Sequence, residues 1–541
     1  MGKSELRVRR LICFYAIWII LSAVLLGRLF LVMVFPHGFL AGAGGVSVPR
    51  WKLDAEHFDL EMTSDARGHI EFADGRLWQA SGMAGNVKQS GGQQADVSSP
   101  ATPQAIEALD SAHSDSARAS VVAPEIVGAI GLPDVWPKAG KVVPEQGRSG
   151  LEYTFDALLS GRRPGLIGQI APPTGASEVP PAMKPSETFT LTPISGKNVV
   201  TTMDESKQRA AEQLLRAAGV AHASIVSIAL PDGDISVLAS ANHQFSDALR
   251  AIAPGSVFKL VTGAAALESH TYRSDAHFVC RGFLRIPRVR LHCWRTHGRL
   301  SLREAIAQSC DVAFAEMGIR LGRTALAVQA QRFGLDTTGL VPYGAEDMIP
   351  GADKGVVYRH SGEDEGLLAN TAIGQEDVRM TPLQGALLAA TLAEDGRYHR
   401  ARLVRGFSDA QGRFTPFYRR RADATGRDAC SPYTASVLRE GMWAAVHNPS
   451  GTAYPLHTYP IAAKTGTAEL PNGHVNAWLI GYQVNASGTP ISAFAICVAD
   501  EPSAQAHAHL FALAKKWLAP LAPPARPNSA ARQIQCPRCI N

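Results

Sequence analysis

Three short strings of polar residues, far apart along the chain, constrain the fold more than any other feature of this sequence. In order, they are Ser256-Val-Phe-Lys259, Ser309-Cys310-Asp311 and Lys464-Thr465-Gly466-Thr467. Together they supply a nucleophile with a base beside it, a second hydroxyl with an acidic neighbour, and a cationic strand. These groups can cooperate only if the fold brings the strings together. The sequence therefore predicts a serine acyl-transfer site where a helix and a strand meet.

The first string begins a helix. Residues 253–255, Ala-Pro-Gly, predict a turn, and the apolar run at 260–267 predicts a buried helix after it. Three positions apart, Ser256 and Lys259 share one helical face, so Lys259 can hydrogen-bond the serine hydroxyl. A lysine with an ordinary pKa of about 10.4 is protonated at neutral pH and cannot accept a proton. Burial or a second cation must lower that pKa, and Lys464 is the candidate cation.

Other segments resemble those of the monofunctional (class B) penicillin-binding proteins, the membrane-anchored transpeptidases that cross-link bacterial peptidoglycan. Residues 147–152 resemble the junction between that family's pedestal and its catalytic domain, and 67–70 resemble a degraded first motif of the pedestal. The resemblance extends to about residue 518 and includes further segments at 297–302, 370–375, 381–384, 451–453 and 477–481.

The resemblance implies an α/β (α+β) fold. This is a penicillin-binding/serine beta-lactamase-like transpeptidase domain with a five-stranded antiparallel sheet and a helical subdomain, preceded by a transmembrane helix and a small pedestal. The residue pattern independently favours a sheet with helices on both faces. It predicts helices at 204–218 and 504–518, and strands at 223–230, 235–239, 461–468, 476–483 and 491–499.

The resemblance also implies a role for each catalytic residue. Ser256 attacks the carbonyl of a D-Ala-D-Ala stem peptide, and Lys259 takes its proton. Ser309 relays a proton to the leaving D-alanine with the help of Lys464. The backbone N–H groups of Ser256 and Thr467 form the oxyanion hole, in which each donor contributes about 3 kcal/mol.

Residues of the third string are expected to bind substrate. By resemblance, the hydroxyls of Thr465 and Thr467 hold the terminal carboxylate, and Gly466 lets the backbone approach the substrate closely. An amine from a neighbouring stem peptide then resolves the acyl-enzyme. Beta-lactams would acylate the same Ser256 and leave slowly.

Asp311 departs from the family pattern, which has asparagine there in most members. An amide donates and accepts hydrogen bonds, whereas a carboxylate only accepts. The elongation-type branch resembles this chain in using Ser-x-Asp followed by an aromatic residue, here Phe314, and we interpret Asp311 as a marker of that branch. A catalytically weakened relative is the alternative.

The N-terminus combines cations with a long apolar run. Four cations within 1–10 precede mainly apolar residues at 11–35, interrupted by Arg28. Such a run can cross a bilayer, and the leading cations place the N-terminus in the cytoplasm. We predict a single-pass protein of the bacterial inner (plasma) membrane with a periplasmic catalytic domain. A cleaved signal peptide is the alternative, because residues 41–43 resemble a cleavage site.

The predicted domains follow from this anchor and from composition. Within the pedestal, residues 79–120 contain few large apolar side chains and predict a disordered insertion. Residues 172–193 are rich in Pro, Thr and Ser and predict a linker. The whole order is a cytoplasmic tail at 1–10, the anchor at 11–35, the pedestal at 36–195, the transpeptidase domain at 196–521 and a tail at 522–541.

Eight cysteines are present. Cys280 and Cys293 are predicted to form a disulfide that closes a short loop in an oxidising compartment. A metal site with His292 and His297 is the alternative. Cys310 is predicted to be a buried core residue. Neither a metal nor a cofactor is part of the prediction.

Composition agrees with a large exported enzyme. A chain of 541 residues with 46% hydrophobic residues can bury a substantial core, and a net charge of +5 spread along the chain does not indicate nucleic-acid binding. The expected partners are peptidoglycan stem peptides, beta-lactams and the inner membrane. The pedestal is too short to contain a glycosyltransferase, so the resemblance implies a polytopic, SEDS-type glycan polymerase as a further partner.

Two other functions stay open at this point. One is a beta-lactam-binding scaffold or sensor with little transpeptidase activity. Asp311 and the degraded pedestal motif leave this alternative open. The other is a beta-lactamase, which shares the acylation chemistry but rarely has a membrane anchor and a pedestal.

Overall fold

The computed structural model describes most of the catalytic part of the chain and pieces of the preceding region. The described residues are 58–64, 67–78, 122–131, 145–161, 165–170, 188–243, 246–287, 289–342, 349–359, 364–417 and 426–519. The chain divides into two units, residues 1–59 with 169–187 and residues 60–168 with 188–541, and nearly all described residues belong to the second. Within the described ranges, no helix has the length and apolar character needed to cross a bilayer. The predicted anchor at 11–35, the insertion at 79–120 and the tails at 1–10 and 522–541 lie outside these ranges.

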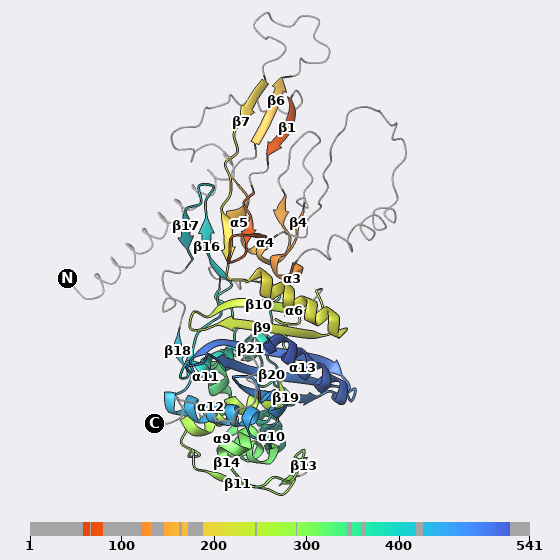
Figure 1. The fold of residues 1–541 in the computed structure, drawn as a ribbon, viewed down its shortest axis with the longest axis vertical. Coiled ribbons are helices and arrows are strands. Elements are labelled where there is room, and N and C mark those ends of the chain that lie inside the picture. The colour runs from red at the N-terminus through yellow and green to blue at the C-terminus, as the bar shows by residue number, and fades with distance from the viewer. Residues whose placement is uncertain are drawn as a thin grey trace, which may run out of the picture. The chain divides into compact units, whose positions relative to one another are not determined.

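A five-stranded antiparallel sheet organises the catalytic part (Figure 1). Its strand order is β10-β9-β21-β20-β19, so the early strand β9 pairs with the last strand β21, and Ile225 lies opposite Ile496. This pairing confirms the predicted antiparallel sheet of five strands. The strands are β9 (Ala223–Ala229), β10 (Asp234–Ser240), β19 (Ile461–Glu469), β20 (Val475–Val484) and β21 (Pro490–Glu501).

Helices cover both faces of this sheet, as predicted. Successive side chains of a strand point to opposite faces. Ile225 and Leu479 therefore belong to a buried cluster with α6 (Glu205–Ala218) and α13 (Ser503–Leu518). Their neighbours Val226 and Ile480 belong to the larger core that contains α11 (Pro382–Ala393). Burial on both faces fixes the register of the strands, because a slip of one residue would exchange the two sets.

A helix-rich segment connects β10 to β19 and contains two of the three strings. Two of its helices begin with capping boxes, at Ser301 with Glu304 and at Thr381 with Gln384, which satisfy free N–H groups at each start. Its elements are η3 (Gly255–Phe258), α7 (Lys259–Glu268), β11 (His277–Cys280), β12 (Phe283–Ile286), β13 (Val289–His292), β14 (Gly298–Ser301), α8 (Leu302–Ala307), α9 (Asp311–Arg332), α10 (Glu365–Ala372), α11, α12 (Pro432–His447) and η5 (Tyr454–Leu456).

Smaller sheets complete the fold. One has the order β17-β16-β8-β2-β3, in which β8 lies between the strand of Ile70 and a hairpin from the catalytic part. The strand β7 (Thr188–Leu191) lies inside the segment predicted to be a linker, so that prediction was wrong for its last residues. The remaining elements are β1 (Phe58–Ser64), β2 (Ile70–Glu71), β3 (Leu77–Trp78), α3 (Pro124–Val127), β4 (Ile130–Gly131), β5 (Gln146–Gly147), α4 (Gly150–Thr154), α5 (Asp156–Leu159), β6 (Gly165–Ile170), β8 (Asn198–Thr201), β15 (Arg397–Tyr398), β16 (Val404–Ser408), β17 (Phe414–Pro416) and β18 (Arg427–Asp428).

Arg67 joins the two upstream segments that the sequence singled out. Its guanidinium bonds Glu152 at 2.5 Å and Asp156 at 2.7 Å, and the side chains of Arg67 and Glu152 are each only 6% exposed. Burial alone would raise the pKa of Asp156, but hydrogen bonds from the Gly147 N–H and from Arg67 outweigh it and lower that pKa. The segments at 67–70 and 147–152 are therefore held together by a buried charge network.

Replacing Arg67 by methionine is expected to destabilise this region by about 3–5 kcal/mol, because two carboxylates lose their buried counter-charge. Arg76→Met is the matched control, since Arg76 is 69% exposed and a surface pair contributes about 0–1 kcal/mol. Urea unfolding of the full chain in detergent, combined with limited proteolysis, measures the difference. Equal stability of the two variants would contradict the role assigned to Arg67.

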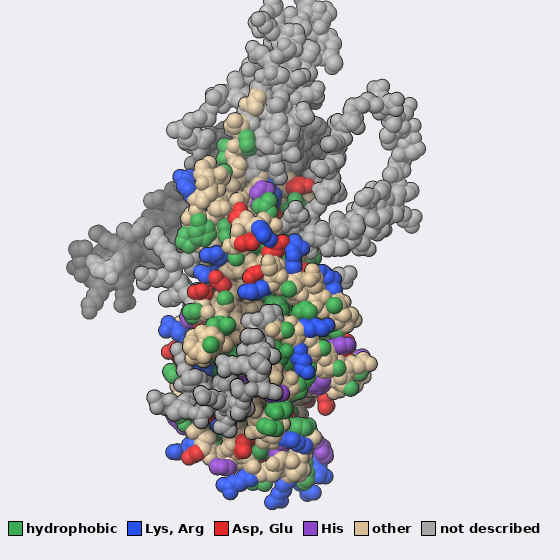
Figure 2. Space-filling model, viewed as in Figure 1, with side chains coloured by type: hydrophobic (Ala, Val, Ile, Leu, Met, Phe, Trp, Pro, Cys, Tyr) green, Lys and Arg blue, Asp and Glu red, His purple; other side chains and the backbone are tan. Residues whose placement is uncertain are grey.

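Cations and carboxylates are interspersed over the face of the described surface in Figure 2. Cations gather at the end that carries β11 to β14, where four exposed arginines lie: Arg281, Arg285, Arg290 and Arg299. Arg290 also lines a cleft of about 850 Å³. The carboxylates of Asp311, Glu376 and Glu469 line the same cleft, so its wall carries charges of both signs.

Candidate active site

Ser256 lies in a tight turn pressed against strand β19. The predicted helix begins instead with the 3₁₀ turn η3, and the α-helix α7 starts at Lys259. Gly255 precedes the serine with φ of 55°, and a Cβ on it would lie 2.1 Å from the carbonyl oxygen of Thr467. Only glycine permits both this backbone conformation and this close approach. The turn thereby brings the backbone around Ser256 next to the third string.

Lys259 is fully buried beneath the serine. Its Nζ donates to the Ser309 carbonyl at 2.8 Å, to Ser309 Oγ at 3.2 Å and to Asp311 Oδ1 at 2.7 Å. Among the described residues, no hydrogen bond joins it to Ser256 Oγ, so the predicted contact is not formed in this state. The Asp311 carboxylate attracts the ammonium more strongly than a neutral hydroxyl does.

Ser309 occupies the turn between α8 and α9 with φ of 56°. This left-handed conformation is uncommon for a residue with a Cβ and persists where the surroundings enforce it. The turn presents both the carbonyl and the hydroxyl of Ser309 to Lys259. The second string is thus positioned by local backbone geometry as well as by its side chains.

Lys464 reaches the same hydroxyl from strand β19. Its Nζ lies 2.9 Å from Ser309 Oγ and donates to the Thr465 carbonyl at 2.8 Å. Burial, reinforced by the positive charge of Lys259, lowers the pKa of Lys464 well below its ordinary value. The two lysines thus meet at the hydroxyl of Ser309.

Asp311 is the first residue of α9, where a helix N-terminus favours a negative charge. Its side chain is 18% exposed and forms the only ion pair of Lys259 among the described residues. The carboxylate therefore compensates a buried cation. The ion pair with Lys259 therefore gives a structural reason for an acidic residue at position 311.

The other residues of the third string line the cleft wall. Thr465 Oγ1 donates to Thr452 Oγ1 at 2.6 Å, and Gln375 Nε2 donates to the Thr467 carbonyl at 3.3 Å. A Cβ on Gly466 would lie 2.4 Å from the Pro254 carbonyl oxygen, so glycine is required where the strand touches the turn. The sequence assigned no role to Thr452, although it lies in one of the segments that resemble the family.

All three strings open into one cleft of about 850 Å³. His507 and Phe511 of α13 form part of its wall. No motif in the sequence marks them, because they lie in an ordinary helix far along the chain from the third string. His292, which was considered as a metal ligand, lines the cleft instead. The cleft is lined by Ser256, Arg290, Leu291, His292, Trp294, Ser309, Asp311, Asn370, Ile373, Gln375, Glu376, Thr452, Thr465, Thr467, Glu469, His507 and Phe511.

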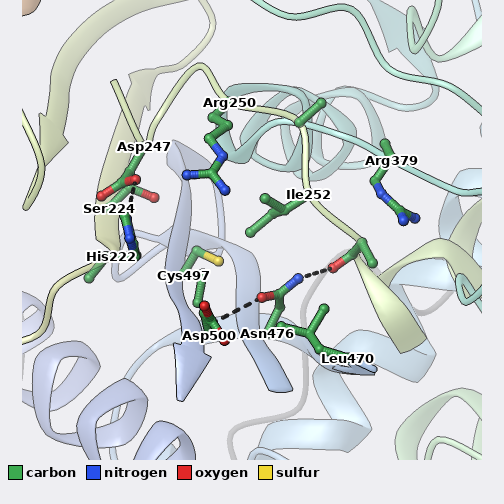
Figure 3. A pocket seen from close by; sticks show the side chains of 14 residues that line it. His222, Ser224, Asp247, Arg250, Ile252, Arg379, Leu470, Asn476, Cys497 and Asp500 are labelled. Atoms are coloured by element: carbon green, nitrogen blue, oxygen red, sulfur yellow. Dashed lines mark hydrogen bonds and ion pairs between the residues drawn. The ribbon is translucent and has the colours of Figure 1, made fainter. Parts of the chain in front are cut away.

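A second cavity of about 230 Å³ lies behind the residues that lead to Ser256 (Figure 3). Asn476 of strand β20 links two neighbouring segments in Figure 3: its amide nitrogen lies 3.4 Å from the Ala253 carbonyl oxygen, and its Oδ1 accepts from the Asp500 N–H at 3.2 Å. Trp478 Nε1 donates to the same Ala253 carbonyl at 3.0 Å. Strand β20 thus anchors the chain just before the serine.

Cys280 and Cys293 are not joined, so the predicted disulfide is absent. Both approach His297, whose Nδ1 lies 3.5 Å from each sulfur. Cys310 completes the group, and all four ligand atoms lie within 4.8 Å of one another. The prediction failed because the spacing of two cysteines does not reveal a third cysteine and a histidine that fold against them.

This four-residue cysteine and histidine cluster fits a tetrahedral zinc ion. Zinc bonds of about 2.3 Å to sulfur and 2.0 Å to nitrogen place neighbouring ligand atoms about 3.3–3.8 Å apart. A hydrogen bond from the Cys310 thiol is the main cause that lowers the pKa of Cys293 to about 5, which favours the thiolate that metals bind. Cys310 directly precedes Asp311, whose N–H donates to Cys293 Sγ at 3.3 Å. A metal ion bound to this cluster would therefore hold the second string in position.

Protein purified without chelators is expected to carry about one zinc per chain, because the four side chains match a closed structural site. Cys280→Ser should lose the zinc, lower the thermal midpoint and slow acylation by penicillin. Cys497→Ser is the control, since Cys497 is buried outside the cluster. Elemental analysis by mass spectrometry reads the metal directly. Zinc-free protein after growth with added zinc would contradict this assignment.

Comparison with known proteins agrees with the fold and the cleft. The profile of the penicillin-binding protein transpeptidase domain matches residues 225–516. The peptidoglycan D,D-transpeptidase PbpA of Mycolicibacterium smegmatis is 29% identical over 382 residues, which are 62% of this chain and 71% of that protein. These matches define the chain as a transpeptidase by class.

Solved structures extend the comparison. The imipenem acyl-enzyme complex of penicillin-binding protein A from Mycobacterium tuberculosis shares 27% identity with a TM-score of 0.51, over 61% of this chain and 81% of that one. The apo form of penicillin-binding protein 3 from the same organism shares the fold at 19% identity, with a TM-score of 0.59 over 86% and 98% of the two chains. The chain belongs to the penicillin-binding protein transpeptidase family and, within it, to class B.

Proposed function

We propose that this chain is a peptidoglycan D,D-transpeptidase that cross-links stem peptides through a Ser256 acyl-enzyme and is acylated by beta-lactams. The observation that carries the proposal is the convergence of Lys259 and Lys464 on the Ser309 hydroxyl, in the same cleft as Ser256. Two amines that share one hydroxyl, in a cleft that Ser256 also lines, can move protons between a nucleophile and a leaving group.

Acylation begins when Ser256 Oγ attacks the carbonyl carbon of the penultimate D-alanine. The serine proton passes to Lys259 in its neutral amine form, and the negative charge on the carbonyl oxygen is held by the N–H groups of Ser256 and Thr467. Such donors contribute about 3 kcal/mol each when they are preorganised. The close packing of Gly255 against Thr467 supports this pairing of the two N–H groups.

Departure of the terminal D-alanine requires a proton on its nitrogen. Ser309 Oγ lies between the two lysines and can deliver that proton while Lys464 replaces it. A lowered pKa suits Lys464 to exchange protons near neutral pH. The C–N bond then breaks, which leaves an ester between Ser256 and the penultimate D-alanine.

The second half-reaction reverses these roles. An amine from a neighbouring stem peptide attacks the ester carbonyl and gives up a proton, Ser256 Oγ leaves and regains a proton, and the new amide bond is the cross-link. Thr465 and Thr467 are the residues proposed to hold the terminal carboxylate of the donor peptide, because both line the cleft next to Ser256.

The proposal extends to the cellular setting. Residues 11–35 would anchor the chain in the bacterial inner membrane, with a cytoplasmic N-terminus and a periplasmic catalytic domain. A polytopic SEDS-type membrane polymerase would supply the glycan strands. Asp311 supports placement in the elongation-type branch.

The direct test incubates the full chain in detergent with glycan strands that carry pentapeptide stems, followed by muramidase digestion and mass spectrometry. Cross-linked dimers together with released D-alanine support the proposal. A stable beta-lactam adduct without any cross-linked dimers would favour the scaffold or sensor. The ion pair between Lys259 and Asp311 leaves that alternative open. Rapid hydrolysis of penicillin would favour a beta-lactamase.

A further inference from the structure

His507 contacts the third string from helix α13. It projects from α13, lines the cleft and is half-buried. Its Nε2 lies 2.9 Å from Thr467 Oγ1, and its Nδ1 lies 2.7 Å from the Ser503 carbonyl oxygen. Among the described residues these are its only hydrogen-bond partners. The ring is therefore fixed at both nitrogens.

The partner at Nδ1 decides what Nε2 can do. A carbonyl oxygen only accepts hydrogen bonds, so Nδ1 carries the proton that it donates to Ser503. In the neutral imidazole, Nε2 is then unprotonated and must accept the proton of the Thr467 hydroxyl. Thr467 in that state presents only lone pairs to the cleft, and those repel a carboxylate.

Protonation reverses the direction of this hydrogen bond. Both nitrogens of an imidazolium are donors, so Nε2–H would donate to Thr467 Oγ1. The hydroxyl proton of Thr467 is then free to point into the cleft and donate to an anion. The imidazolium also adds a positive charge close to that anion.

We propose that His507 is a positioning residue whose protonation turns the Thr467 hydroxyl into a donor for the terminal carboxylate of the substrate. The inference rests on the proposed function, because it takes Thr467 as part of the carboxylate site. It predicts that a stem peptide, or a beta-lactam with a free carboxylate, reacts better at a pH of about 5.5 than at a pH of about 8.

Other titratable groups surround His507 and must be separated from it. Within the described part of the chain, no hydrogen bond or ion pair joins any of them to His507. The acids, basic residues and histidines on or near the elements packed against α13, on the cleft wall and on α13 itself are Glu469, Asp311, Lys464, Arg290, His292, Glu376, His474, Asp500, Glu501, His457, Glu205, Lys207, Arg209, Glu212, Arg216, His509, Lys515 and Lys516. Their titration is common to the wild type and to variants of His507, so a ratio of rate constants cancels it.

The test measures second-order rate constants for acylation of the full chain by benzylpenicillin across this pH range. His507→Phe removes both donor and acceptor, which leaves the Thr467 hydroxyl free at every pH. The ratio of wild type to His507→Phe is expected to fall about tenfold from acid to alkaline pH, the size of a hydrogen bond to a charged group. His507→Gln offers an amide donor at every pH and should lose the pH dependence while keeping the acid rate.

Two controls separate positioning from a structural effect. His509→Phe lies on the same helix, and His509 bonds Glu501 instead of the third string, so its ratio to wild type should not vary with pH. A penicillin methyl ester lacks the carboxylate and should give a flat ratio with His507→Phe. With stem peptide as substrate, the change should appear in KM more than in kcat.

Each outcome decides the inference. A ratio that is flat with pH, in a protein that still forms the penicillin adduct, overturns the role of His507 and leaves the proposed function intact. A pH-dependent ratio with the methyl ester also overturns it, because the effect would not involve the carboxylate. Wild-type protein that forms no adduct overturns the proposed function and this inference together.

Discussion

Ser256→Ala is expected to lower the rate of cross-linking about a million-fold, because loss of the nucleophile in a serine acyl-transfer enzyme leaves only substrate binding and the oxyanion hole. No covalent penicillin adduct should form. The fold should survive, since the half-buried side chain is small and its turn is fixed by the backbone of Gly255.

Quantitative product analysis of the muramidase digest measures this loss. Ser487→Ala is a suitable control, because Ser487 is exposed in the turn between β20 and β21. Residual cross-linking by Ser256→Ala within a hundredfold of wild type would contradict the assignment of the nucleophile.

Lys259→Ala is expected to slow acylation by about 10²–10⁴-fold, the contribution of a positioned base. It should also destabilise the protein by about 3–5 kcal/mol, because Asp311 loses the cation that it pairs with at 2.7 Å. The two effects have different causes, so they can be separated by a second substitution.

The double variant Lys259→Ala with Asp311→Asn makes this separation. It removes the unpaired carboxylate and should regain much of the stability without regaining activity. Stopped-flow acylation and thermal unfolding of the same samples give both quantities. Recovery of activity in the double variant would show that Lys259 acts only by neutralising Asp311.

The strings and the sheet could be predicted because each depends on local pattern. Short apolar runs bounded by turn residues predicted the strands β9, β10, β19, β20 and β21 within a few residues. The motif at 381–384 gave the start of α11. The likeness to a known family singled out the segments at 67–70 and 147–152, but the contact of Arg67 with Glu152 that joins them came from the structure.

Features that depend on tertiary geometry could not be predicted. The partner of Lys259 is set by the turn at Ser309, whose positive φ no sequence pattern announces. The cysteine cluster needs Cys310 and His297 to fold against β11. His507 reaches Thr467 only because α13 packs on the sheet beside β19. In each case, the feature depends on which helices and strands come into contact in the folded chain.

The central claim is that Ser256 is acylated in the cleft formed by the three strings. The most direct measurement incubates the full chain with benzylpenicillin, follows its intact mass over hours and maps the adduct by peptide mass spectrometry. One penicillin per chain, long-lived and located on the peptide that contains Ser256, is the predicted result. An adduct on another residue, or no adduct at all, would contradict the account.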